Sequence, residues 1–348
     1  MHPKGFLPLA LLMISTFAFA ANADPAAHPI LPPSAPLTAP PNDEDKDIYT
    51  IVFENDVFAD TDHDYTDGVR ASYLSSEANA PDWLKWGANH LLPFGLDGAK
   101  HMSLALGQNM YTPTNLSAKG PIRDDRPYAG WLYGSVGVVS DTGKTLDSLQ
   151  LSLGVVGPYS YAEQTQDFIH KAVTGSPIPQ GWDNQIKTEP GIMLTYERKW
   201  RALYQLSPFG LGVDFTPQGG VNLGNVETDA QIGGTVRIGY DLPADYGPPR
   251  VRPSLPGSDY FVPTKDLGGY LFAGVEGRAV AHNIFLDGNT FANSQHVTRE
   301  PFVGSVQAGV ALTLGEARLS YTQVFMSREF EEQKTPEQFG VVTVSYRF

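Results

Sequence analysis

The constraint that most limits the fold is a period-two alternation of apolar and polar residues, which recurs in short segments from residue 48 onward. The clearest segment, residues 148–155, alternates serine, glutamine or glycine with leucine or valine. Successive side chains of a β-strand point to opposite faces, so each such segment predicts a strand with one apolar and one polar face. Comparable segments at 192–197, 235–241 and 271–279 place glutamate or arginine on the polar face, which must therefore meet water or pair internally.

These alternating runs predict about twelve strands, an even number, as is typical of single-chain outer-membrane barrels. The strands are expected near residues 48–55, 66–75, 101–108, 129–139, 147–156, 190–199, 207–224 (one long strand or two short ones), 229–241, 268–280, 303–314, 316–326 and 338–348. The last strand ends in Phe348, and an alternating strand closed by an aromatic residue resembles the assembly signal of such barrels. We predict an all-β fold, a twelve-stranded antiparallel transmembrane β-barrel. The alternative is a soluble β-sandwich.

The N-terminus predicts export. A basic start, an apolar run from Phe6 to Ala20 and small residues suited to cleavage indicate a signal peptide over residues 1–23. Residues 24–47 are rich in Pro and Ala and then acidic, which predicts an extended linker. The barrel is expected to occupy residues 48–348, where the alternating segments lie. No segment after the signal peptide offers the roughly 20 apolar residues of a membrane helix.

Composition excludes several classes of function. The chain has no cysteine, which rules out disulfides, thiolate metal sites and an acylated cysteine anchor. Its formal net charge of -14 argues against a nucleic-acid partner, because no basic stripe is present to displace counterions from phosphates.

With both termini in the periplasm, the connections at 56–65, 109–128 and 157–189 would face the cell exterior. The last of these has helical spacing in its middle, which predicts a short helix in an extracellular loop that presents Gln166 and His170, four residues apart, on one face. At the other end, the insert 76–100 carries tryptophans and predicts an interfacial helix. The Pro-rich insert 242–267 is expected to be irregular.

Two outward connections contain candidate binding residues. Asn55 and Asp56 open an acidic stretch, and carboxylates and amides crowded at the end of a strand suit Ca²⁺, which takes about 6–8 oxygen ligands. An acidic turn built on Asp and Gly is an equal alternative. Arg126 in the second connection suits a phosphate, although an ion pair with Asp124 or Asp125 is the favoured interpretation.

The sequence has no Gly-x-Ser-x-Gly elbow and no serine placed beside a histidine, so it does not favour an acyl-enzyme. A water nucleophile activated by His170 is more economical, since imidazoles titrate near neutrality. A cation in the acidic connection would polarise an ester carbonyl and steady the oxyanion. The competing interpretation of His170 alone is a surface residue on a solvated helix.

Six motifs occur in order through residues 48–198: Phe53-Glu54-Asn55-Asp56 with Asp64-Tyr65-Thr66-Asp67-Gly68, Gln108-x-Met110-Tyr111-Thr112-Pro113, Asp125-Arg126-Pro127-Tyr128-Ala129-Gly130-Trp131, Gly154-Val155-Val156-Gly157-Pro158, Gln166-x-x-x-His170 and Trp182-Asp183-Asn184-Gln185. Together they resemble the lipid A 3′-O-deacylase family of Gram-negative outer membranes. The resemblance continues more loosely, as barrel strands, to Phe348.

The resemblance implies an active site at the extracellular end of the barrel. It implies a carboxylic ester hydrolase that depends on Ca²⁺ and removes the 3′-acyloxyacyl group from lipid A within lipopolysaccharide. His170 would be the general base, Gln166 a neighbour in its polar network, and Thr66 would line the site near the oxyanion.

For the ion, the resemblance implies that Asn55 and Asp56 help bind Ca²⁺. A lysine of the second connection meets a lipid A phosphate in the family, and Lys119 is the candidate here. The alternatives are an outer-membrane phospholipase and a non-enzymatic porin or structural barrel. A porin would have a polar lumen without a convergent histidine, amide and carboxylate set at one rim.

Overall fold

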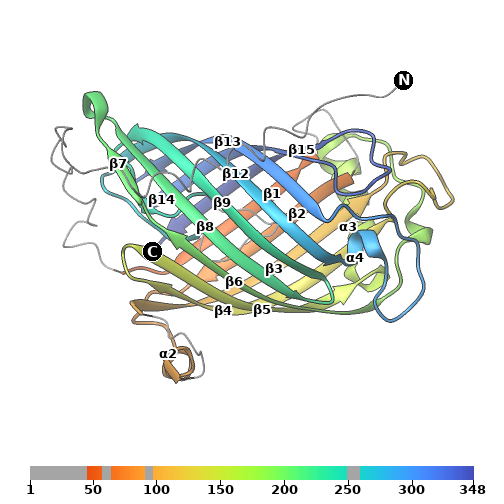
Figure 1. Cartoon of the computed structure of the whole chain (residues 1–348), viewed down its shortest axis with the longest axis horizontal. Coiled ribbons are helices and arrows are strands. Elements are labelled where there is room, and N and C mark those ends of the chain that lie inside the picture. Colours follow the sequence, from red (N-terminus) through yellow and green to blue (C-terminus); the bar gives the residue numbers. More distant parts are fainter. Residues whose placement is uncertain (1–44, 57–63, 91–96, 249–258) are drawn as a thin grey trace, which may run out of the picture. The chain divides into compact units, whose positions relative to one another are not determined.

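The alternating segments form the antiparallel strands of one β-sheet that closes on itself (Figure 1). β6 (Glu189–Trp200) pairs with β5 (Thr145–Val156) on one side and with β8 (Gly212–Gly224) on the other, which joins the two ends of the sheet. The sheet has 13 strands, of which the short β7 (Tyr204–Leu206) pairs only with β8, so twelve strands make the described barrel. The predicted twelve-stranded antiparallel barrel is confirmed.

The structure, a computed structural model, describes residues 45–56, 64–90, 97–248 and 259–348, without the side chains at 64–66, 173 and 174. The predicted signal peptide and most of the predicted linker fall outside these residues. The remaining barrel strands are β1 (Ile48–Asn55), β2 (Asp64–Leu74), β3 (Ala99–Thr112), β4 (Ala129–Asp141), β9 (Glu227–Tyr240), β12 (Leu267–Asn283), β13 (Phe302–Leu314), β14 (Ala317–Met326) and β15 (Glu337–Arg347).

Three α-helices lie in the connections that the structure describes: α2 (Asp82–His90), α3 (Ala162–Ile169) and α4 (Ile284–Asp287). None of the described helices is long and apolar enough to cross a membrane. α3 lies in the connection after β5, where the helical spacing predicts a helix, and α2 lies in the predicted insert after β2.

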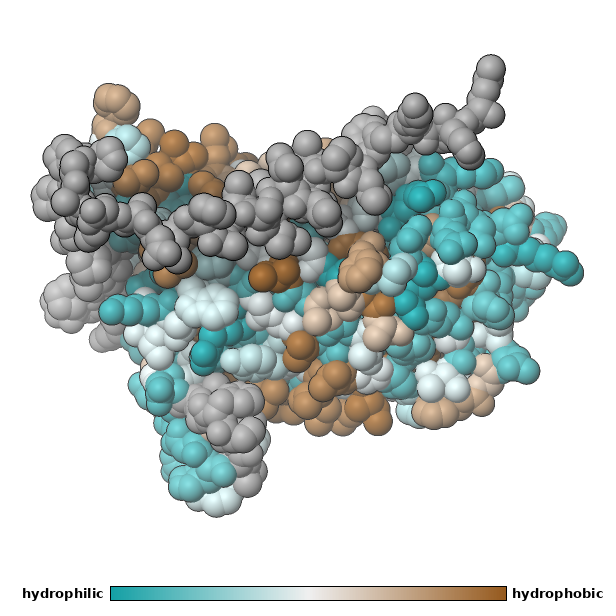
Figure 2. All heavy atoms as spheres, in the orientation of Figure 1, coloured by the Kyte–Doolittle hydropathy of each residue, from teal (hydrophilic) through white to brown (hydrophobic). Residues whose placement is uncertain are grey.

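β6 shows how the barrel sorts its side chains. Ile192 and Leu194 are exposed on the outer wall, whereas Thr195 and Glu197 are buried on the inner side. Apolar residues spread over the wall in Figure 2, and hydrophilic residues gather at the right-hand end, where α3 and α4 lie in Figure 1. This arrangement suits lipid, because hydrocarbon meets the wall while polar groups find partners inside. The soluble β-sandwich is therefore wrong.

The two ends of the barrel differ. We call the end at which β1 begins and β15 finishes the terminal end, and the opposite end, which carries α3 and α4, the loop end (Figure 1). At the terminal end the backbone N–H of Phe348 donates to the carbonyl oxygen of Asp47 at 3.1 Å. The Phe348 ring also stacks on Tyr49, with ring centroids 4.7 Å apart. The last residue therefore adds a side-chain contact between the first and last strands of the barrel.

The segment between β9 and β12 turns into the lumen at the terminal end. Within its described part, β10 (Ala244–Asp245) pairs with β11 (Phe261–Val262), and Tyr246 beside them is buried. Tyr246 and Phe261 belong to an apolar cluster that includes Ile48 of the barrel wall. The insert predicted to be irregular is thus packed against the inside of the barrel where the structure describes it.

Ion pairs fix this segment. Asp245 accepts hydrogen bonds from Arg237 of β9 and Arg318 of β14, and Asp259 pairs with Arg70 of β2 at 2.8 Å. These three arginines are buried and point inward from well-separated strands of the barrel. Buried charges are stable only when they are paired, so the two aspartates hold the segment against the barrel wall.

Asp245→Ala should destabilise the barrel, because it leaves Arg237 and Arg318 without the carboxylate that they share. Removing one partner of a buried ion pair costs about 3–5 kcal/mol. We expect a lower temperature for the loss of the fast-migrating folded band on a gel. Lys265→Ala is the control, since Lys265 is exposed beside Asp241 and exposed pairs contribute little. An unchanged transition would show that the segment does not stabilise the barrel.

Candidate active site

The first loop-end connection buries its polar residues. Glu54, Asn55, Asp56 and Asp67 are all buried where β1 ends and β2 begins. The Asn55 amide nitrogen donates to Asp67 Oδ1, which directs the Asn55 carbonyl oxygen away from Asp67. In the described residues no group of three or more His, Cys, Asp or Glu is arranged to hold a metal ion. A cation bound by Asn55 and Asp56 would therefore also need backbone or water oxygens.

The α3 region covers the outer wall of the barrel at the loop end. In the middle of the wall the outward-pointing Ile51 and Leu106 are exposed. Further along the same strands the outward positions carry Phe53, Asn55 and Met110, and none of these is exposed. Residues of the connection after β5 pack against Phe53 and Met110. Asn55 lies two residues beyond Phe53 in the same strand, so it shares the outward face and points away from the lumen.

An apolar cluster holds α3 on the wall. Ala162 and Ile169 of α3 pack with Met110 of β3 and with Tyr128 and Trp182 from the loops, and all five are buried. The helix also needs space at Gly130 on β4, where an added Cβ would lie 2.3 Å from the Cβ of Ala162 and 2.2 Å from Ser160 Oγ. A glycine at this outward position is what lets the chain approach the strand so closely.

Gln166 and His170, predicted to share a face, are both buried. The indole N–H of Trp182 donates to Gln166 Oε1 at 2.8 Å, which fixes the orientation of the amide. The amide nitrogen of Gln166 is buried and has no hydrogen-bond partner within the described chain. A buried donor of this kind is costly unless a substrate or water accepts from it.

A backbone carbonyl determines which ring nitrogen of the neutral His170 carries the proton. Its Nδ1 lies 2.7 Å from the carbonyl oxygen of Pro177, and a carbonyl can only accept, so Nδ1 carries the proton in the neutral ring. Nε2 is then the nitrogen at which the ring accepts a proton. His170 also begins a π-helical turn, His170–Thr174, a local distortion that is frequent at functional sites. The surface-residue interpretation of His170 is wrong, because only 2% of it is exposed.

Acidic side chains lie on α3 and beside it. Glu163 lies in its first turn, and burial, followed by the nearby Asp167 and Asp183, raises the pKa of its carboxyl above the ordinary value. The carboxylates of Glu163, Asp167 and Asp183 lie close enough to interact, and such a group favours a cation at the loop end. Lys171 is exposed and pairs with Asp167 at 3.1 Å.

The second connection, 113–128, contains both candidate phosphate ligands, but the two differ in exposure. Lys119 is exposed, and its backbone carbonyl accepts a hydrogen bond from Asn184 at 2.8 Å, which ties this connection to the one that carries α3. Arg126 is fully buried. Its guanidinium donates to Glu329 at 2.7 Å and lies over the Tyr111 ring at 5.2 Å.

The ion pair of Arg126 was favoured by the sequence, but its partner differs from the one expected. Asp125 instead accepts from the backbone N–H groups of Thr114 and Arg126, both at 2.8 Å, and so shapes the connection. Glu329 also lies 3.5 Å from Arg278, so one carboxylate joins two buried arginines. Arg126 is thus placed as an anchor of the loop end.

Three contacts of the site were missed by sequence reasoning: the Pro177 carbonyl, the Glu329 carboxylate and the donation from Trp182 to Gln166. Only Trp182 had a signal, because it belongs to a quoted motif. Thr66, proposed near the oxyanion, lies in β2, and its side chain is outside the described part of the structure.

Comparison with known proteins identifies the family of this chain. The model of the family described as outer membrane protein LpxR matches residues 7–348. The chain belongs to the LpxR family. This confirms the predicted resemblance to outer-membrane lipid A deacylases and the predicted outer-membrane location.

One solved structure shows the same fold. LpxR from Salmonella typhimurium has a TM-score of 0.70 and 20% sequence identity, and the match covers 86% of this chain and 100% of that chain. The β domain of the Bordetella autotransporter BrkA is more distant, with a TM-score of 0.41, 11% identity and coverage of 88% and 100%. Comparison with curated protein sequences gives no match.

Arg126→Ala should lower stability, because it removes a cation that pairs with the buried Glu329. The expected loss is about 3 kcal/mol, the lower end for a broken buried pair, measured as a lower temperature for loss of the folded gel band. Arg123→Ala, an exposed neighbour in the same connection, should leave the transition unchanged. A stable Arg126→Ala protein with weakened substrate binding alone would restore the phosphate interpretation.

Proposed function

We propose that this LpxR-family protein is a Ca²⁺-dependent esterase that removes the 3′-acyloxyacyl group from lipid A. The observation that carries the proposal is the buried pair Gln166 and His170, oriented by Trp182 and Pro177 in a connection that packs on the outer wall. A histidine, an amide and carboxylates thus lie at the loop end, on connections that reach the outer wall. A porin has no need of such a set.

The position on the wall suits a lipid. With the loop end facing the cell exterior, the wall below α3 meets the leaflet that contains lipid A. Tyr159, Tyr161 and Phe168 of this connection are exposed, as aromatic residues at a membrane interface are. The acyl chains would approach along the apolar wall while the sugar remains beside the polar loops.

Water is the proposed nucleophile. His170 takes a proton from water at Nε2 while the water oxygen attacks the ester carbonyl carbon. The bond from that carbon to the sugar oxygen then breaks, and His170 returns the proton to the departing oxygen. The products are a free acyloxyacyl acid and a hydroxyl on the sugar. The amide nitrogen of Gln166 would donate a hydrogen bond that orients the water or the ester.

The residues of the first connection fit a Ca²⁺ site in part. The Asp56 carboxylate, the directed amide oxygen of Asn55 and the acidic surroundings of α3 suit a hard cation. A bound ion would polarise the ester carbonyl and stabilise the oxyanion. Lys119, exposed on the neighbouring connection, is the proposed contact for a lipid A phosphate.

His170→Ala should leave barrel assembly and heat-modifiability intact, because α3 and its π turn lie outside the strand ladder. Turnover should fall by roughly 10²–10⁴-fold, the usual contribution of a general base. The measurement is lipid A deacylation in detergent with saturating Ca²⁺, followed by mass spectrometry of the lipid.

His296→Ala is the matched control, since His296 is exposed in the β12–β13 connection at the same end of the barrel. It should keep wild-type turnover. Wild-type turnover in His170→Ala would refute the mechanism, and failure of that variant to assemble would give the histidine a structural role instead.

A chelator of divalent cations should abolish activity, and added Ca²⁺ should restore it. Asp56→Asn should raise the Ca²⁺ concentration needed for half-maximal turnover, because it removes one negative charge from a site for a hard cation. Asp124→Asn, an exposed acid in the next connection, is the control and should leave this requirement unchanged. Full activity of the wild type in chelator would make the acidic connection a structural turn.

A further inference from the structure

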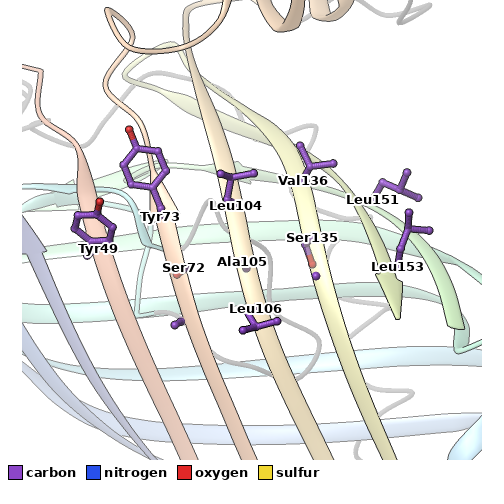
Figure 3. A pocket seen from close by; sticks show the side chains of 12 residues that line it. Tyr49, Ser72, Tyr73, Leu104, Ala105, Leu106, Ser135, Val136, Leu151 and Leu153 are labelled. Carbon is purple, nitrogen blue, oxygen red and sulfur yellow. The ribbon is translucent and has the colours of Figure 1, made fainter. Parts of the chain in front are cut away.

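The outer wall is hollowed near the terminal end, on the side that carries α2. One hollow of about 510 Å³ lies between α2 and strands β4–β6, lined by Trp83, Trp86, Val138, Leu149 and Leu194 among others. A second hollow of about 570 Å³ runs along β1–β5 (Figure 3). Each is within the range of about 300–1,000 Å³ typical of small-molecule sites.

The two hollows are neighbours on the wall, because Val136 and Leu151 line both. The second hollow arises from a small residue among large ones. Gly134 occupies an outward position on β4 between the outward side chains of Leu104, Val136 and Leu153, which are labelled in Figure 3. We call this surface, from α2 to Leu153, the wall groove.

α2 borders the wall groove at the terminal end of the barrel. Its Leu84 and Ala88 are buried against Val138 of the barrel, while Trp83 and Trp86 remain 64% and 57% exposed. Exposed tryptophans beside an apolar surface are typical of the level at which headgroups begin. α2 therefore marks the membrane boundary at the terminal end, and the groove runs from it toward the bilayer interior.

Two lysines lie near this boundary. Lys85 belongs to α2, and Lys144 is exposed in the turn that joins β4 to β5, the strands that α2 packs against. Neither lysine lines the hollows themselves, but both belong to the elements that border them at the terminal end, where a cation suits an anionic phosphate. The opposite rim, by contrast, carries the acidic α3 region.

We propose that the wall groove binds one glycerophospholipid of the periplasmic leaflet, with its phosphate beside Lys85 and Lys144 and an acyl chain along Gly134. The reason is topological: α2 follows β2, so it lies at the opposite end of the barrel from the candidate active site. With lipid A substrate at the loop end, the leaflet at α2 is the one that contains phospholipid. The proposal rests on the orientation used for the proposed function and not on hydrolysis.

Native mass spectrometry of the full-length protein in detergent tests this, with phosphatidylglycerol, phosphatidylethanolamine or purified lipopolysaccharide added in turn. The wild type should retain one phospholipid after loosely bound lipid is removed. Gly134→Leu should lose it, because the new side chain fills the groove. The substitution should be tolerated, since the nearest atom to an added Cβ is a carbonyl oxygen at 3.9 Å.

Gly277→Leu is the matched control. Gly277 is also an outward glycine of a barrel strand, β12, with nothing within 4 Å of an added Cβ, but it lines neither hollow. It should keep the lipid. Lys85→Ala with Lys144→Ala should weaken retention of phosphatidylglycerol in particular, because this lipid carries a net negative charge.

Equal retention by Gly134→Leu and Gly277→Leu would overturn the proposal and leave only a general lipid annulus. Retention of lipopolysaccharide in place of phospholipid would overturn it too, and would also call the orientation into question. Deacylation by Gly134→Leu should match the wild type, so failure of the lipid site and failure of the esterase are separate results.

Discussion

The structure depends on one requirement: a backbone in hydrocarbon must satisfy its hydrogen bonds within the protein. The pairing of β6 with β8 meets it by removing the last free edge of the sheet. Closure then divides every strand into an outward and an inward face, and the inward face has to pair its polar groups with one another. The ion pairs of Asp245 and Asp259 with inward arginines follow from closure, because charges enclosed in the lumen are stable only with partners.

The strands could be predicted because their signal is local. Inside and outside alternate with the pleat, so each run of residues reports its own orientation, and the strand positions agree to within a few residues. The pair of Gln166 and His170 could be predicted for the same reason, since residues four apart on a helix share a face. Both predictions use one stretch of chain at a time.

Contacts between distant segments could not be predicted in this way. Arg126 and Glu329 are separated by 203 residues, and the sequence near Arg126 offers two closer acids that the fold uses differently. Asp245 and Asp259 look like acids of an irregular loop, and only the closed barrel turns them toward inward arginines. The Pro177 carbonyl has no side-chain signature at all. A single sequence identifies groups that carry chemistry, but the closed sheet decides which groups meet.

Closure also explains why the candidate site lies outside the lumen. The lumen at the terminal end is occupied by the β9–β12 segment, and at the loop end it is crossed by the Glu329 ion pairs. A large amphipathic lipid would have to leave the bilayer entirely to enter such an interior. On the outer wall its acyl chains can remain in contact with apolar side chains, and only the ester needs to reach the polar groups. The glycine at position 130 and the cluster around Ile169 hold α3 against the wall, so that Gln166 and His170 are shielded from water beside a surface that lipid already covers.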